Sequence, residues 1–185
     1  MLRYKKMKTR RIIYLSIFLA LTVVLGYIES FLPAILPGVK PGFANIIILM
    51  VLLYFSWWEA LALSLIRVFI VSLLCGSVFQ FGFFVSLSGA TISFLVMFLL
   101  HVLLKEKISV FGISIAGSFF HVTAQVFMVF ILMDFNVGTF YYLPWIMLLS
   151  FPMGALTGFI MHIINKSPIA KSLQRKEDSQ EQLDS

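Results

Sequence analysis

Charged residues and cysteine are scarce in this sequence. Asp, Glu, Lys and Arg make up 12% of its 185 residues, and hydrophobic residues make up 61%. Soluble domains carry about 25% charged residues, so this composition excludes an ordinary water-soluble domain. The one cysteine, Cys75, excludes an internal disulfide and is interpreted as a small apolar residue within a span.

The motifs of energy-coupled and metal-dependent catalysis are also missing. The sequence has no Gly-x-x-x-x-Gly-Lys-Ser/Thr loop, and its three aspartates, Asp134, Asp178 and Asp184, do not cluster as Mg²⁺ and a diphosphate require. It lacks His-x-x-x-His and Cys-x-x-Cys spacings as well as paired carboxylates inside its apolar segments. We therefore predict no catalytic residue, no metal and no cofactor, and a binder that depends on another protein for energy.

Long apolar segments dominate what is present. A helix needs about 20 residues to cross the hydrocarbon core of a bilayer. The second of six candidate segments is short and could be re-entrant. The sequence predicts an all-α integral membrane protein, a bundle of six transmembrane helices. The predicted spans are Ile12–Leu32, Gly42–Trp58, Glu59–Cys75, Gln80–Leu104, Val110–Met133 and Leu143–Ile164.

The basic residues predict an orientation, because cytoplasmic flanks of membrane spans are enriched in Lys and Arg. With six spans and a cytoplasmic N-terminus, twelve basic residues lie inside and only Lys40 lies in an outside loop. We expect a multi-pass protein of the bacterial cytoplasmic membrane with both termini in the cytoplasm. Residues 1–11 form a basic cytoplasmic N-terminus, 12–164 the membrane domain and 165–185 a polar, disordered cytoplasmic tail. The basic flanks do not indicate nucleic-acid binding, and the first apolar run is too long for a signal peptide.

Arg67 lies in the middle of an apolar run from Ala60 to Cys75. A guanidinium at the bilayer centre costs about 2.5–3.5 kcal/mol on insertion scales, so such a residue faces a bundle interior and has a partner. Several other polar residues are expected at a similar, outer-half depth on four spans and one loop. The predicted substrate-binding residues are Glu29, Lys40, Asn45, Arg67, His121 and Gln125.

Each of these residues also has a structural interpretation. Arg67 and Glu29 could form an ion pair that serves only the fold, and His121 could hydrogen-bond a neighbouring helix. Lys40 could extend its amino group to the membrane surface, and Asn45 could cap or bridge helices. Their shared depth favours a site for a small polar or anionic ligand that enters from outside.

Small residues spaced four apart allow helices to approach closely in lipid. Gly154 and Gly158 form such a pair. A stripe of Gly and Ser at residues 82, 86, 89 and 93 has spacings of four, three and four. For these, packing within one bundle is the favoured interpretation. Ser16 and Ala20, on the first span, are instead predicted to dock to a partner membrane subunit.

Several strings resemble one known family. Gly26-Tyr-Ile-Glu29, Pro37-Gly-Val-Lys-Pro-Gly-Phe-Ala-Asn45, Ser86-Leu-Ser-Gly89 and His121-x-x-x-Gln125 are similar to the bacterial Gx transporter family, also labelled heptaprenyl diphosphate synthase component I. The resemblance covers about residues 15–164. The fifth-span string departs from the family pattern, which has Asn after the His and Gly before the Gln.

More remotely, this family resembles the substrate-binding S components of energy-coupling-factor (ECF) vitamin transporters. That resemblance implies a six-helix fold with an outward-facing pocket, a coupling membrane subunit that docks on the first helix, and two cytoplasmic ATPases. We therefore favour a substrate-capture subunit of an uptake transporter. The alternative is a non-catalytic membrane accessory subunit of a heptaprenyl diphosphate synthase, and a third, weaker class is a structural scaffold.

Overall fold

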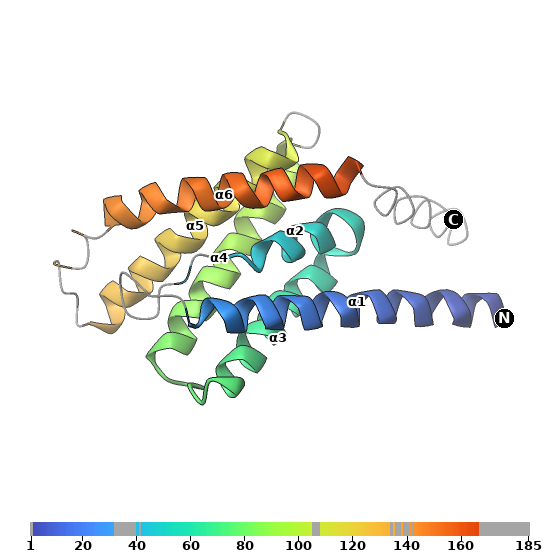
Figure 1. Ribbon diagram of the computed structural model, residues 1–185, viewed down its shortest axis with the longest axis horizontal. Coiled ribbons are helices and arrows are strands. Elements are labelled where there is room, and N and C mark those ends of the chain that lie inside the picture. Colours follow the sequence, from blue (N-terminus) through green and yellow to red (C-terminus); the bar gives the residue numbers. More distant parts are fainter. Residues whose placement is uncertain are drawn as a thin grey trace.

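The computed structural model describes residues 2–31, 40, 42–104, 108–133, 135, 138, 141 and 143–166. Within these residues the chain forms six α-helices and no strand, as the all-α prediction requires. Residues 167–185, which hold most of the predicted tail, and the inner-loop residues Lys105 and Lys107 lie outside this description. In Figure 1 the helices are α1 (Leu2–Glu29), α2 (Asn45–Tyr54), α3 (Trp57–Leu74), α4 (Phe81–Leu104), α5 (Val110–Leu132) and α6 (Leu143–Lys166).

Five of these helices are long and apolar enough to cross a membrane: α1, α3, α4, α5 and α6. The predicted bounds of the last four agree with the structure within two residues. Helix α1 differs, because it begins at Leu2 and ends at Glu29, so the basic N-terminus continues the first span as helix. This is an all-α membrane protein.

The second predicted segment, residues 42–58, which could have been a full span or re-entrant, forms only a short helix. Helix α2 has 10 residues, which gives about 15 Å of helix, half of what a hydrocarbon core requires. Residues 42–44 are not helical, and Gly42 has φ +83°, a conformation that glycine adopts without strain. The second and third segments separate at residues 55–56 and not between residues 58 and 59, because Trp57 and Trp58 belong to the first turn of α3.

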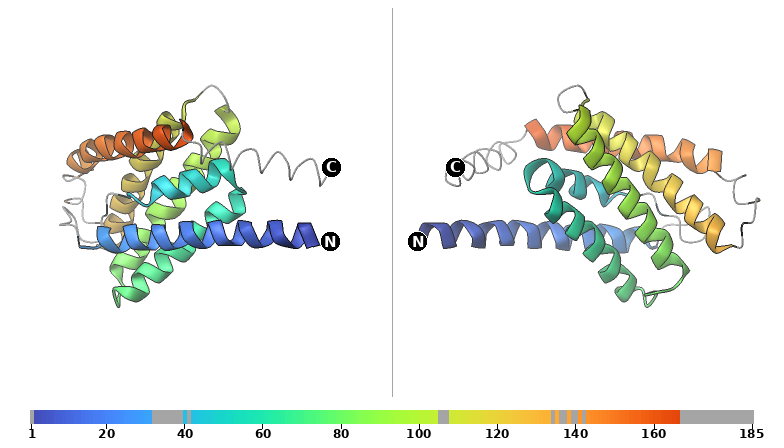
Figure 2. Two further views of the ribbon diagram at one scale, coloured as in Figure 1. Left: turned by 45° about the vertical axis from the view of Figure 1, so that its right-hand side comes forward. Right: turned by 180° about the vertical axis from the view of Figure 1, so that it is seen from behind.

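Successive helices alternate in direction (Figure 1). The start of α1 and the end of α6 lie at the same end of the molecule, together with the turn from α2 to α3. Figure 2 shows the first turns of α1 extending past the other helices at this end, which we call the inner end. Helix α1 contacts only α2 and α3 among the described helices, so it lies at the edge of the bundle.

Helix α2 lies at the centre, in contact with every other helix. It begins near the middle of the molecule and runs toward the inner end (Figure 1). Eight of its ten residues are buried, including Ile48 at 0% exposure. A helix that is apolar on all sides requires burial on all sides, and this explains why so short an element occupies the core.

The turn between α2 and α3 is held by a capping box. Ser56 and Glu59 bond to each other's backbone, which satisfies free amides at the start of α3. Glu59 also binds Arg11 of α1 through two hydrogen bonds of 2.8 and 2.7 Å. One carboxylate therefore ends the turn and joins α1 to α3 at the inner end.

The small-residue pair on α6 packs inside the bundle, as expected. A Cβ added to Gly154 would lie 2.8 Å from the Cα of Ile115, and one added to Gly158 would lie 3.1 Å from the Cα of Phe111. Both neighbours are on α5. The α6 backbone can approach α5 this closely because these positions have no side chain.

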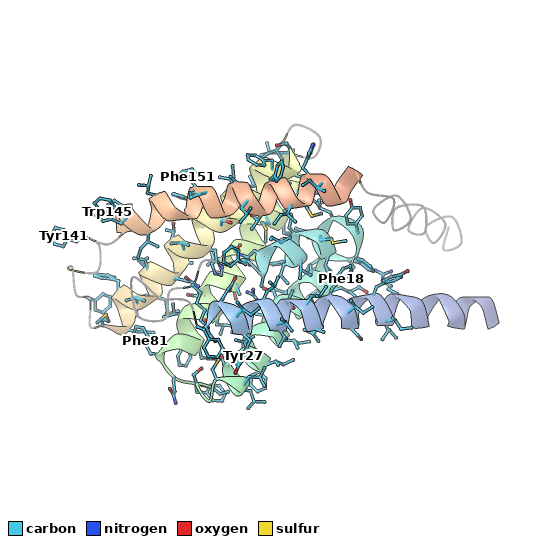
Figure 3. The ribbon with its side chains drawn as sticks, in the orientation of Figure 1. Phe18, Tyr27, Phe81, Tyr141, Trp145 and Phe151 are labelled. Carbon is cyan, nitrogen blue, oxygen red and sulfur yellow. The ribbon has the colours of Figure 1, made fainter. Side chains whose placement is uncertain are left out.

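The outer surface of the bundle carries large apolar side chains. Figure 3 shows Tyr141 and Trp145 projecting at the end opposite the inner end, and both are mostly exposed. At the inner end Trp58 is 62% exposed and stacks on Trp57 with ring centroids 4.0 Å apart. Aromatic side chains at both ends of an apolar surface are typical of the two membrane interfaces.

Candidate ligand site

A polar cavity lies between α1, α3, α4, α5 and the chain that precedes α2. Its volume is about 20 Å³, which is room for one small group such as a water molecule. Five of the six predicted site residues line it, and the sixth, Asn45, does not. The lining residues are Gly26, Glu29, Lys40, Arg67, Val68, Val71, Ser72, Ser86, His121 and Gln125.

Arg67 reaches the cavity from the middle of α3 and is 5% exposed. Its side-chain carbons pass Gly26 of α1, where an added Cβ would lie 3.9 Å from its Cγ and Cδ. The structure shows no hydrogen bond or ion pair from the Arg67 guanidinium to any described residue. Because Arg67 lines the cavity, the donors that no described residue accepts can serve a ligand there.

Glu29, at the end of α1, forms its hydrogen bond with the chain before α2 and not with Arg67. Its Oε1 accepts from the backbone N–H of Ala44 at 3.1 Å, immediately before α2. The first amides of a helix are unsatisfied donors with partial positive charge, so a carboxylate there is stabilised. Glu29 and Arg67 interact electrostatically but are not an ion pair within 4.0 Å.

Gln125 and His121, one turn apart on α5, form a directed chain of hydrogen bonds. The backbone N–H of Lys40 donates to Gln125 Oε1 at 2.9 Å, so the amide nitrogen of Gln125 faces His121 Nε2, 3.0 Å away. An amide nitrogen only donates, so His121 Nε2 accepts and the imidazole is neutral with its hydrogen on Nδ1. That Nδ1 is buried without a hydrogen-bond partner.

Two glycines make room for this chain. A Cβ at Gly89 of α4 would lie 2.7 Å from Gln125 Cγ and 3.0 Å from His121 Cε1. A Cβ at Gly42 would lie 2.9 Å from His121 Cδ2. Both positions need glycine because the two α5 side chains lie directly against the neighbouring backbone.

Lys40 is half-buried and adds a second cation beside the cavity. Burial lowers the pKa of its amino group, and the nearby Glu29 carboxylate acts in the opposite direction. The side chain lines the cavity, and the backbone N–H holds this part of the chain to α5.

Asn45 bridges helices, which was one of its two interpretations. Its Nδ2 donates to Ser93 Oγ of α4 at 3.3 Å, and Ser93 Oγ donates to the carbonyl of Gly117 on α5 at 2.8 Å. This buried relay joins α2, α4 and α5 beside the cavity without lining it.

Sequence reasoning missed Ser72 and Ser86 as site residues. Ser86 Oγ is buried and has no hydrogen-bond partner, although it lines the cavity. The sequence did contain a signal for Ser86, which lies one turn before Gly89 on the stripe of small residues that we assigned to packing. Ser72 lies five residues after Arg67, so a helical wheel does not place it beside that residue.

The two predicted docking residues lie away from the cavity. Ser16 and Ala20 are exposed on the outer face of α1. Among the residues whose side chains are described, no cluster of three or more His, Cys, Asp or Glu could hold a metal ion.

Comparison with known proteins gives a family and no close relative. No curated protein and no solved structure matches the chain. A model of the family described as heptaprenyl diphosphate synthase component I matches residues 18–164, from the first span to the end of the sixth helix. The match includes every residue that lines the cavity. The chain therefore belongs to the heptaprenyl diphosphate synthase component I family, also known as the Gx transporter family.

Proposed function

We propose that this protein is the membrane-embedded substrate-binding subunit of an uptake transporter for a small polar or anionic molecule. The observation that carries the proposal is the cavity around Arg67, in which a buried guanidinium has no protein acceptor among the described residues. A protein that served only as an anchor would gain nothing from this costly arrangement.

The six predicted residues have separate roles in this proposal. Arg67 and Lys40 attract and bind the ligand, and a guanidinium offers a planar fork that suits a carboxylate or phosphate. His121 and Gln125 form the wall of the cavity on α5, while Glu29 and Asn45 hold the start of α2 beside the ligand.

Energy would come from other subunits, since the sequence has no phosphate-binding loop of its own. Cytoplasmic ATPases and a coupling membrane subunit would supply it. The coupling subunit would dock on α1, where Ser16 and Ala20 are exposed on a helix at the edge of the bundle. Close approach at small residues is the usual means of helix association in lipid.

The proposal includes an orientation in the bacterial cytoplasmic membrane. The inner end would face the cytoplasm, because the basic N-terminal segment and the end of α6 lie there (Figure 1). The cavity would then open toward the outside.

Mass spectrometry of small molecules retained by the purified protein tests this function. We expect one polar or anionic metabolite to be retained, and cells that express the chain to take it up faster than cells that do not. Protein that retains no such molecule, and expression that leaves uptake of the tested metabolites unchanged, would contradict the proposal.

The family description favours a second candidate, a non-catalytic membrane subunit of a heptaprenyl diphosphate synthase. In that role the chain would bind a cytoplasmic catalytic subunit at its inner end. The discriminating measurement is prenyl-chain synthesis by the catalytic subunit with and without this protein in vesicles. Activity that rises on addition, and rises equally with an Arg67→Lys variant, would favour the second candidate.

A further inference from the structure

The charges around the cavity do not balance. Arg67 and Lys40 are cations, and Glu29 is the one carboxylate among the described residues that line the cavity. Protonation of Glu29 would only increase the excess of positive charge. Moving an unbalanced charge out of water costs several kcal/mol, so a region of this kind requires a counter-charge.

Hydrogen-bond donors at the cavity also lack partners among the described residues. The Arg67 guanidinium has five N–H donors and makes no hydrogen bond to a described residue. Ser86 Oγ is buried without a partner at the same cavity. Two acceptors at the cavity already have donors, since Glu29 Oε1 accepts from the Ala44 N–H and Gln125 Oε1 accepts from the Lys40 N–H.

We propose that this cavity binds one anionic group, a carboxylate or a phosphate, held by Arg67, Lys40 and Ser86. The inference deepens the proposed function, on which it rests, by naming the chemical class of the ligand's buried end. Charge-assisted hydrogen bonds from Arg67 are the strongest that the cavity can offer, and an anion is the group that accepts them.

The size of the cavity limits what is buried there. The cavity is open on one side and holds about 20 Å³, so only a small end group of a ligand is enclosed in it. The anionic end of the ligand therefore lies against Arg67 and the rest of it lies toward the outer end. A free inorganic anion has the same chemistry and occupies the cavity when no organic ligand is present.

Melting temperatures of the full-length protein in detergent test this inference. Chloride, acetate and phosphate are each titrated at constant ionic strength, and the midpoint of unfolding is followed. Binding to the native state alone stabilises it by mass action, so the melting temperature should rise with anion concentration. Acetate acting at lower concentration than chloride and phosphate assigns the site to a carboxylate, and phosphate acting at lower concentration than the other two assigns it to a phosphoryl group or free phosphate.

Two variants separate binding from folding. Arg67→Gln should weaken the apparent anion affinity by about tenfold or more, the loss expected for a charge-assisted contact. Ser86→Ala should weaken it by about two- to tenfold, as one ordinary hydrogen bond does. Because Ser86 Oγ has no partner in the structure, Ser86→Ala should leave the melting temperature without added anion unchanged.

Ser88→Ala is the matched control on the same helix. Ser88 Oγ donates to the carbonyls of Val85 and Ala124 and does not line the cavity. This variant should melt at a lower temperature and keep the full response to anions. The inference is overturned if Arg67→Gln and Ser86→Ala respond to anions as the wild type does, or if none of the three anions stabilises the wild type.

This outcome is distinct from failure of the transport function. A retained neutral or cationic metabolite, together with no response to anions, would leave the substrate-binding role in place and remove the anionic class. A clear anion response without any retained metabolite or uptake would support the anionic class and remove the substrate-binding role.

Discussion

At the scale of single residues, Glu29 shows how a carboxylate in an apolar segment can serve the fold. It accepts from the Ala44 amide and so fixes the start of α2. From the sequence, an ion pair with Arg67 was the obvious structural role. Spacing alone cannot show that an unsatisfied helix amide lies nearer than the guanidinium, because α2 is not contiguous with either residue in sequence.

We predict that Glu29→Ala destabilises the protein more than Glu29→Gln does. Alanine leaves the buried Ala44 N–H without an acceptor, at a cost of about 1–3 kcal/mol, whereas the glutamine carbonyl can still accept. Chemical or thermal unfolding in detergent measures the difference. Equal losses for both variants would show that the charge of Glu29, not its hydrogen bond, holds α2.

Gly89 gives a second residue-scale prediction. Gly89→Ala would place a Cβ 2.7 Å from Gln125 Cγ, so the Gln125–His121 pair must move and ligand binding should weaken. Gly82→Ala, two turns earlier on the same face of α4, places its Cβ in open space and should be neutral or stabilise the protein by about 0.5–1 kcal/mol. Unfolding midpoints of the two variants provide the comparison, and similar behaviour of both would contradict the close approach.

At the scale of elements, sequence periodicity and length located five helices well, because each is long, apolar and bounded by a break. They failed for α2. A run of apolar residues shows that a segment is buried, but it does not show whether the segment is surrounded by lipid or by other helices. Helix α2 is surrounded by protein, so ten residues suffice, and residues 42–44 immediately before it are not helical.

The docking prediction on α1 also belongs to the scale of elements. Ala20→Trp should block close approach of a partner helix at the exposed face, and Ala20 does not line the cavity. Co-purification of the coupling subunit should fall and ligand retention by the isolated chain should remain. Leu21→Trp, at another exposed position of the same helix, provides a size-matched control. Undiminished co-purification with Ala20→Trp would refute the docking face.

At the scale of the whole molecule, the candidate site was predictable in part because charge is so scarce here. Few side chains could satisfy a buried arginine, so depth alone grouped Glu29, Lys40, His121 and Gln125 with Arg67. Depth alone could not show that Asn45 lies beside the cavity without lining it and bonds to Ser93 instead. It also could not find Ser86, since serine is common wherever helices pack.

The native cysteine tests the orientation of the molecule. Cys75 is exposed at the end of α3 opposite the inner end and is the one cysteine in the chain. A membrane-impermeant maleimide added to intact cells should label it. In a Cys75→Ser background, Lys105→Cys should be labelled only after the membrane is opened. Labelling of Lys105→Cys in intact cells would reverse the proposed orientation.

The central claim, that the cavity around Arg67 binds a ligand, is tested most directly by one conservative change. Arg67→Lys keeps the charge but loses the planar fork of donors. Arg11→Lys makes the same chemical change at the inner end, where Arg11 binds Glu59. The measurement is the amount of small molecule that each purified protein retains, determined by mass spectrometry per mole of protein. We predict that Arg67→Lys is expressed and folded but retains about a tenth or less of the wild-type amount, and that Arg11→Lys retains all of it. Equal retention by wild type and Arg67→Lys would contradict the account.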